Sequence, residues 1–312
     1  MADRAAQESK TVQFEKKAED VVAAELRAAM QKAFTKALAS YSAAAGGLDK
    51  PLNDAARKAL EKALERELRA ITPKTKGKLL RATKDALNLG AAQARKDIGK
   101  KVVSSPRPDK VLTREINRID KLAKQDIEEA IQLLKERGIR NQHDLNLVLA
   151  RANQAVNRVE STTRWATNRA VSSGATTVMV AAGVQKMWVP EPDACLHCLA
   201  YAGQVVDADK PFPGGLTFGD KPLSTDPVDG PPLHPNCRCR VVAWLGSEAG
   251  TPTETPEVLK REAERAVLRG KGQASEPASL RAADRLISNG TSLPKTVVQR
   301  AQRAIAAGKF ST

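Results

Sequence analysis

Two short runs, Cys195-Leu196-His197-Cys198 and His234-Pro235-Asn236-Cys237-Arg238-Cys239, contain all four cysteines of the chain and two of its three histidines. A Cys-x2-Cys run places two thiolates on one tight turn, and two cysteines at spacing two point to the same side of an extended segment. Thiolate-rich, four-coordinate sites favour zinc. The two runs therefore predict a structural zinc ion that closes the long loop between them.

The candidate ligands outnumber the four positions that a structural zinc ion offers. Either His234 replaces one cysteine, or it lies beside the ligands and orients them, and the sequence leaves both arrangements open. Two disulfides or packed free thiols are the alternatives. The first twenty residues are rich in charge and do not resemble a signal segment, so we expect a reducing compartment, which disfavours disulfides. The candidate metal ligands are Cys195, Cys198, His234, Cys237 and Cys239.

The sequence around the two runs has the character of a small sheet. Residues 185–189, 204–206 and 238–244 read as strands separated by loops rich in proline and glycine. A three-stranded sheet of this size buries little apolar surface and needs further stabilisation. Structural zinc supplies on the order of 10 kcal/mol in small domains, which is the physical reason for expecting a metal here.

Most of the remaining chain is predicted to be helical. Apolar residues recur every three or four positions, and aromatic residues make up only 3% of the chain. Thr113 is a candidate helix cap, and Gly174 is a candidate break point in the last long helix. The long helices are expected at about 11–45, 53–70, 113–137 and 144–180, and three short ones after residue 255.

These elements predict a mainly α fold with a small α+β module stapled by zinc. It combines long N-terminal helices, a three-stranded β unit and short C-terminal helices. We expect a basic helical region at 1–110, a domain with the Cys/His cluster at 111–245, and a linker with a short-helix tail at 246–312.

Positive charge is concentrated in the N-terminal half. The chain has a formal net charge of +15, most of it in residues 1–159, whereas residues 160–245 are nearly neutral. A basic surface of this kind fits a polyanion or an acidic protein surface, or it is simply solvated. The most basic segment is 74–110, and no aromatic residue is interleaved in it. Any DNA binding by this segment would therefore depend on phosphate contacts rather than on base stacking. The candidate DNA-binding residues are Lys74, Lys76, Lys78, Arg81, Lys84, Arg95, Lys96, Lys100 and Lys101.

The cysteine region resembles the phage Mu F-like minor head proteins, also called the head morphogenesis family. The similarity lies in a Cys-x2-Cys run, a glycine-containing β segment and a Pro-Pro-x-His-Pro-x-Cys-Arg-Cys tail. The helix at 160–170 is also similar, although the Arg-Thr-Glu order usual there is altered. The resemblance covers about residues 115–245, and its matching words are Trp188, residues 193–198, 203–206 and 231–239.

The resemblance implies a minor capsid protein of a tailed bacteriophage that acts in head morphogenesis. Its partners would be the portal protein, with major capsid or scaffold protein and packaged DNA as further candidates. It would assemble in the host cytoplasm and remain in the virion, inside the capsid or at the portal vertex. No enzyme domain is recognised, and no run of eighteen apolar residues indicates a membrane span.

Two other classes use paired cysteines. A zinc-dependent nuclease of the HNH type would need an open metal site and a base, for which His234 is the candidate. Four cysteines can instead close the zinc site, which argues against this alternative. A zinc-containing transcription factor would need a recognition helix beside the metal, and none is recognised.

Overall fold

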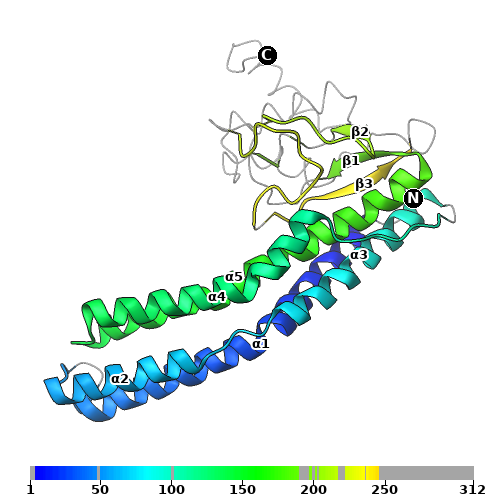
Figure 1. The fold of residues 1–312 in the computed structure, drawn as a ribbon. Coiled ribbons are helices and arrows are strands. Elements are labelled where there is room, and N and C mark those ends of the chain that lie inside the picture. Colours follow the sequence, from blue (N-terminus) through cyan, green and yellow to red (C-terminus); the bar gives the residue numbers. More distant parts are fainter. Residues whose placement is uncertain are drawn as a thin grey trace, which may run out of the picture. The chain divides into compact units, whose positions relative to one another are not determined.

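The computed structural model describes residues 4–47, 50–99, 102–189, 197–198, 201, 204–216, 222–235 and 237–245. In this part of the chain, five helices precede a small sheet (Figure 1). The mainly α fold with a three-stranded sheet is therefore confirmed, whereas the short helices expected in 246–312 lie outside the described residues. The elements are α1 (Arg4–Ala45), α2 (Asp54–Ala70), α3 (Lys76–Ile98), α4 (Lys110–Arg137), α5 (Gln142–Ala182), β1 (Gln185–Val189), β2 (Val205–Asp207) and β3 (Arg240–Trp244).

The chain divides into two compact units. The helical unit consists of residues 14–82 and 110–166, and the sheet unit combines the described parts of 1–13, 83–109 and 167–245. Helices α1, α3 and α5 contribute residues to both units. One change of unit falls at residue 110, where the sequence places a domain boundary, and each unit contains residues from both sides of it.

Apolar stripes and polar caps explain the helical unit. Leu60, Leu64 and Leu68 recur every four residues along α2 and are buried. The Asn53 side chain accepts a hydrogen bond from the Ala56 amide at 2.8 Å and caps this helix. Asp120 of α4 accepts hydrogen bonds from the amide and hydroxyl of Thr75, at 2.7 and 2.6 Å, just before α3 begins. These carboxylate and amide contacts satisfy backbone donors that a helix cannot pair internally.

The start of α4 differs from the sequence prediction. Thr113 was expected to cap this helix, but α4 begins at Lys110, so Thr113 lies inside its first turn. Leu112 is fully buried and extends the apolar stripe of the helix toward its N-terminus. Burial of this residue, rather than the capping preference of threonine, therefore decides where the helix begins.

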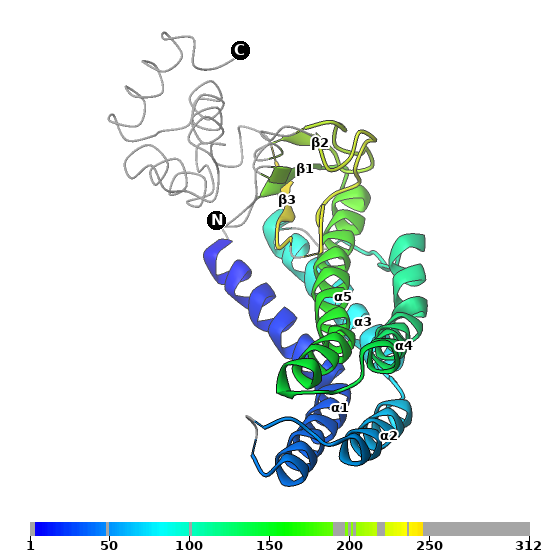
Figure 2. The same cartoon turned by 90° about the vertical axis from the view of Figure 1, so that its left-hand side faces the viewer.

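A buried carboxylate joins α4 to α5, which lie side by side in both views (Figure 1 and Figure 2). Asp126 is only 1% exposed. It accepts hydrogen bonds from both Arg158 and Arg151, with Arg158 Nη2 at 3.0 Å and Arg151 Nη1 at 3.3 Å from Oδ1. Hydrogen bonding to Asp126 is the largest cause that raises the pKa of Arg158, while partial burial acts in the opposite direction.

Replacing Asp126 with alanine is expected to lower the free energy of unfolding by about 2 to 4 kcal/mol, because Arg151 and Arg158 lose the buried carboxylate that both donate to. Urea unfolding followed by circular dichroism measures this change. Asp20→Ala is the matched control, because Asp20 forms a 3.5 Å ion pair with Arg27 on an exposed surface. The control should change stability by less than about 0.5 kcal/mol. Equal effects of the two substitutions would contradict a structural role for the Asp126 cluster.

The sheet has the order β2-β1-β3, with both pairs antiparallel. β1 has the predicted bounds, and β2 and β3 differ from prediction by one or two residues at their ends. Three buried rings gather against one face, with the Trp188 centroid 4.8 Å from Tyr201 and 5.2 Å from Phe212. We call β1 to β3 and their connecting loops, residues 185–245, the β module. Its apolar centre is this trio of rings.

Two glycines allow α3 and α5 to approach closely within the sheet unit. A methyl group at Gly90 would overlap the Val171 carbonyl oxygen, and one at Gly174 would overlap the Leu87 carbonyl oxygen. Helix α5 runs without interruption from Gln142 to Ala182, so the break considered at Gly174 is wrong. Gly174 does not bend the helix. Its missing side chain leaves space for the backbone of α3.

Candidate metal centre

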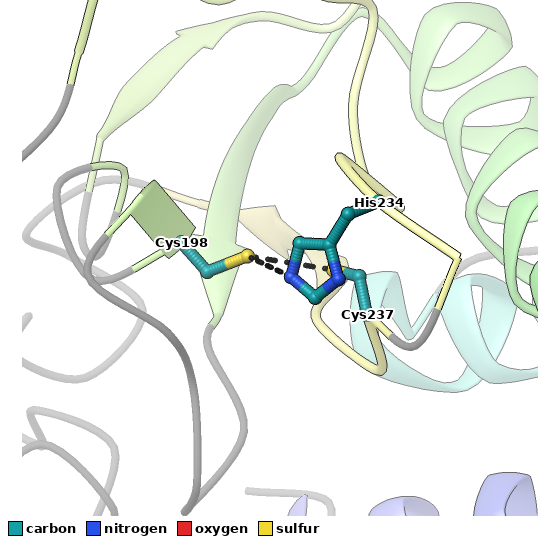
Figure 3. Close-up of side chains that lie close together, drawn as sticks. All are labelled: Cys198, His234 and Cys237. Atoms are coloured by element: carbon teal, nitrogen blue, oxygen red, sulfur yellow. Dashed lines mark hydrogen bonds between the residues drawn. The ribbon is translucent and has the colours of Figure 1, made fainter. Parts of the chain in front are cut away.

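Three of the predicted ligands meet in the β module (Figure 3). The sulfur of Cys198 lies 3.4 Å from Nε2 of His234 and 3.6 Å from the sulfur of Cys237. One donor atom from each of the three residues falls within 4.8 Å of the others. Cys198 and Cys237 are buried and His234 is half-buried. The two cysteine runs of the sequence are therefore brought together as a possible metal-binding cluster.

The spacing of the donor atoms fits a tetrahedral zinc ion. Bonds of about 2.3 Å to sulfur and about 2.05 Å to nitrogen separate two sulfurs by about 3.8 Å, and a sulfur from a nitrogen by about 3.6 Å. The distances of 3.6 Å and 3.4 Å lie close to these values. A disulfide between Cys198 and Cys237 would instead need a sulfur separation of about 2.05 Å. The donor set therefore suits a borderline-soft metal ion.

Backbone hydrogen bonds hold the cluster in place. The Cys237 amide donates to the His234 carbonyl at 3.0 Å, which folds these two ligands onto one turn. On the other side, the Tyr201 amide donates to the Cys198 carbonyl at 3.1 Å, and the Gln204 amide donates to the Tyr201 carbonyl at 3.0 Å. The Trp188 amide then donates to the Gln204 carbonyl at 3.0 Å. The cluster is thereby connected through Tyr201 to the aromatic centre of the β module.

The surroundings of Cys237 favour its thiolate. Hydrogen bonding from Cys198, and then from Cys239, holds the pKa of the Cys237 thiol well below its usual range. Burial raises this pKa but is outweighed. The thiolate is the form of cysteine that binds a metal. The lowered pKa of Cys237 and the distances from its sulfur are therefore both suitable for a metal ligand.

Of the other two predicted ligands, the structure describes only Cys239. Cys239 is 1% exposed and contacts the Cys237 thiol, but it is not one of the three residues that share the 4.8 Å cluster. Cys195 lies outside the described residues. His234 thus lies with Cys198 and Cys237 in the possible metal-binding cluster.

The predicted DNA-binding residues are spread along α3 and its flanks. Lys78 pairs with Glu25 at 2.8 Å, and Arg95 donates hydrogen bonds to the carbonyl groups of Val102 and Ser104. Lys100 and Lys101 lie outside the described residues. The candidates with exposed side chains are Lys74, Lys76, Arg81, Lys84 and Lys96.

Two polar residues of α5 have more specific places than the sequence indicated. Asn168 is only 1% exposed. Arg169 Nε donates to Asp109 Oδ2 at 2.8 Å, and its Nη2 lies 3.8 Å from Asp229 Oδ2. The helical periodicity carries no signal for these contacts, because both acidic partners lie in segments without regular structure.

Comparisons with protein-family models, with curated proteins and with solved structures found no match to this chain. Within the part of the chain that the structure describes, no helix contains an apolar stretch long enough to span a membrane. The possible metal-binding cluster of the β module is therefore the chemical feature that the structure adds to the sequence analysis.

Proposed function

We propose that this protein is a minor capsid protein of a tailed bacteriophage that acts with the portal protein in procapsid assembly. In this proposal it carries one structural zinc ion and remains in the virion. Its further partners are the major capsid or scaffold protein and packaged DNA. The proposal is drawn from the resemblance of the cysteine region to the phage Mu F-like minor head proteins.

One observation carries the proposal: segments that share the family resemblance but lie far apart in sequence meet in one module. Trp188 lies in β1, Cys198 follows this strand, and residues 205 and 206 form most of β2. His234 and Cys237 approach β3 and lie beside Cys198. Parts of a motif that meet around one cluster have a physical reason to occur as a set, because each contributes contacts to the same module.

Quantitative mass spectrometry of purified procapsids and DNA-filled heads tests this proposal. The particles come from the phage or prophage that encodes the chain, and the amount is scaled against portal and major capsid protein. A few copies per head are expected in both particles. Absence from both particles would remove the structural role.

The proposal assigns His234 to metal binding and no catalytic step to the chain. His234 Nε2 lies 3.4 Å from the Cys198 sulfur, as a ligand of the same ion would. The purified zinc-loaded protein is therefore expected to leave plasmid DNA intact. Cleavage that is lost in His234→Ala but kept in His143→Ala would favour the nuclease alternative instead.

DNA contact is proposed for the exposed basic residues of α3. Positions 76, 80, 84, 88, 92 and 96 are all exposed, so one ridge of this helix faces solvent. Within the described residues, Lys76, Lys84 and Lys96 form no ion pair. Unpaired ammonium groups about 12 to 18 Å apart along a helix can each neutralise a separate phosphate.

Replacing Lys76, Lys84 and Lys96 together with glutamine is expected to weaken DNA binding by tenfold or more at low salt. The slope of log affinity against log salt should fall by about 2 to 3, since each lost contact releases about one counterion fewer. Gel shifts of the full chain at several salt concentrations measure both quantities. The control replaces Arg114, Arg118 and Lys121, three exposed basic residues of α4, in the same way. Equal losses in the two triple variants would show that net charge alone matters.

A further inference from the structure

A second site lies in the sheet unit, in a cavity of about 290 Å³ between α5 and the loops that follow β2 and precede β3. We call it the polar cavity. One wall is a face of α5 that carries Arg169 and four hydroxyl residues, at positions 172, 173, 176 and 177. The rest of the lining includes Arg107, Asp109, Lys186 of β1 and residues 208–210 and 229–231. None of the candidate metal ligands lines this cavity.

Lys186 is the unusual member of the lining. Its side chain is 2% exposed, although a lysine ammonium is rarely buried without a paired carboxylate. Its Nζ donates a hydrogen bond to the Asp229 carbonyl oxygen at 2.8 Å and lies 5.2 Å from the centre of the Phe212 ring. An ammonium group has three donors, and the described residues supply one acceptor. Lys186 thus has donor capacity for a ligand in the cavity.

Desolvation of Lys186 supports this interpretation. Burial lowers the pKa of the Lys186 amine and outweighs the opposite effects of Asp229 and Asp209. No described carboxylate lies within 4.0 Å of its Nζ. A buried cation in this position gains more from a bound anion than an exposed lysine would, since solvent does not screen it.

Ser172 provides a second, independent observation. It lies on α5, lines the same cavity and is 4% exposed. Its hydroxyl oxygen is buried and has no hydrogen-bond partner among the described residues. Buried hydroxyl groups are nearly always hydrogen-bonded, so an unpartnered one beside a cavity indicates a missing ligand or solvent partner.

The acidic residues of the lining do not supply that partner. Asp109 accepts a hydrogen bond from Arg169 at 2.8 Å, and Asp209 lies 3.7 Å from Lys210 Nζ. Asp229 contacts Lys186 only through its backbone carbonyl, and its side chain is 86% exposed. The two acids nearest to basic side chains are therefore already engaged, while the buried donors of Lys186 and Ser172 remain available.

We propose that the polar cavity binds a small oxyanion, a phosphate or carboxylate group, through Lys186 and Ser172. Two or more acceptor oxygens on one group can accept hydrogen bonds from both an ammonium and a hydroxyl that line the same cavity. Arg169 also lines the cavity, but its guanidinium is engaged by Asp109 and Asp229, so Lys186 and Ser172 are the groups that would bind the anion. This proposal does not depend on the role of the protein in a phage head.

Isothermal titration calorimetry of the full chain with inorganic phosphate tests the proposal. Acetate is titrated in parallel at the same ionic strength, so that the two arms distinguish a phosphate ligand from a carboxylate ligand. Saturable binding of at least one of them is expected. Lys186→Met should weaken it by about tenfold or more, because it removes a charge-assisted hydrogen bond. Lys121→Met, at an exposed position of α4, is the matched control and should bind as the unaltered protein does.

Ser172→Ala keeps the test valid even if Lys186→Met does not fold. It removes only a hydroxyl without a protein partner, so the melting temperature without ligand should stay the same or rise. Phosphate or acetate affinity should nevertheless fall by about twofold to tenfold. A purely structural role for Ser172 would not lower affinity while leaving stability intact. Absence of saturable binding of both anions up to on the order of 10 mM would overturn the proposal.

Discussion

Removing the proposed zinc ion from the protein is expected to unfold the β module while most of the helical circular dichroism signal remains. A metal ion bound by Cys198, His234 and Cys237 would join the loop after β1 to the segment that enters β3. Structural zinc supplies on the order of 10 kcal/mol in small domains, which exceeds what three short strands provide alone. Tryptophan fluorescence reports the change, because Trp188 and Trp244 lie in β1 and β3. Melting curves that are identical with and without chelator would contradict the structural role.

Substitutions in the cluster give the same test without a chelator. The purified protein is expected to contain one zinc ion per chain by elemental mass spectrometry. His234→Ala should lower this content and destabilise the β module, because it removes a nitrogen ligand next to two buried thiols. His143→Ala is the matched control, since His143 is exposed at the start of α5 and lies outside the cluster. Equal zinc content in the two variants would show that His234 is not a ligand.

The same measurement assigns the fourth ligand. Cys239 lies beside Cys237, and its position two residues further along an extended segment is suitable for coordination. Cys195 belongs to the same Cys-x2-Cys run as Cys198. We expect only one of the substitutions Cys195→Ser and Cys239→Ser to reduce zinc content, because a structural zinc ion has four positions. A reduction in both would require five residues to compete for the ion.

The candidate metal cluster is the part of the site that could be predicted from the sequence. Cysteines and histidines are few in this chain, and their spacing carries local geometry, so Cys198, His234 and Cys237 could be named before their contacts were seen. The strand at 185–189 was also predictable, because its apolar residues lie between a glycine and a proline. Signals of this kind depend on neighbours in sequence.

The polar cavity could not be predicted in the same way. Lys186 occurs in a strand whose other members are Gln185, Met187, Trp188 and Val189, and nothing in this pattern distinguishes a buried lysine from an exposed one. Its burial results from Asp229 and Phe212, which lie in a later loop. Ser172 similarly reads as an ordinary helix residue. The burial of Lys186 and of Ser172 depends on contacts between segments that are distant in sequence. The periodicity of apolar residues contains no information about such contacts.

The low helix propensity of glycine gave a wrong prediction at Gly174. Gly174 was interpreted as a candidate break, because glycine is unfavourable inside a helix by about 1 kcal/mol relative to alanine, and Gly90 carries the same intrinsic cost. Both lie within continuous helices, α3 and α5. Each faces a backbone carbonyl of the other helix, Val171 for Gly90 and Leu87 for Gly174. The intrinsic cost of glycine is offset by the close packing that it permits.

Gly174→Ala is therefore expected to destabilise the sheet unit by about 3 kcal/mol or more, although alanine is the better helix former. The added methyl group would overlap the Leu87 carbonyl oxygen, and a backbone atom cannot rotate away as a side chain can. Helices α3 and α5 must separate locally, which weakens the packing of neighbours such as Leu87 and Val171, both buried. Thermal unfolding followed by circular dichroism measures the loss. Gly90→Ala should have a similar effect.

Gly77→Ala is the control that separates the effect of the backbone overlap from the effect of helix propensity. Gly77 also lies in α3, but a methyl group there would have no atom within 4 Å. Helix propensity then acts alone, so this substitution should leave stability unchanged or raise it by up to about 1 kcal/mol. Opposite signs for the two substitutions are the expected result. If the two substitutions change stability equally, or if both are stabilising, α3 and α5 do not approach closely at Gly174. An overlap with a backbone atom could not be relieved by rotation of a side chain.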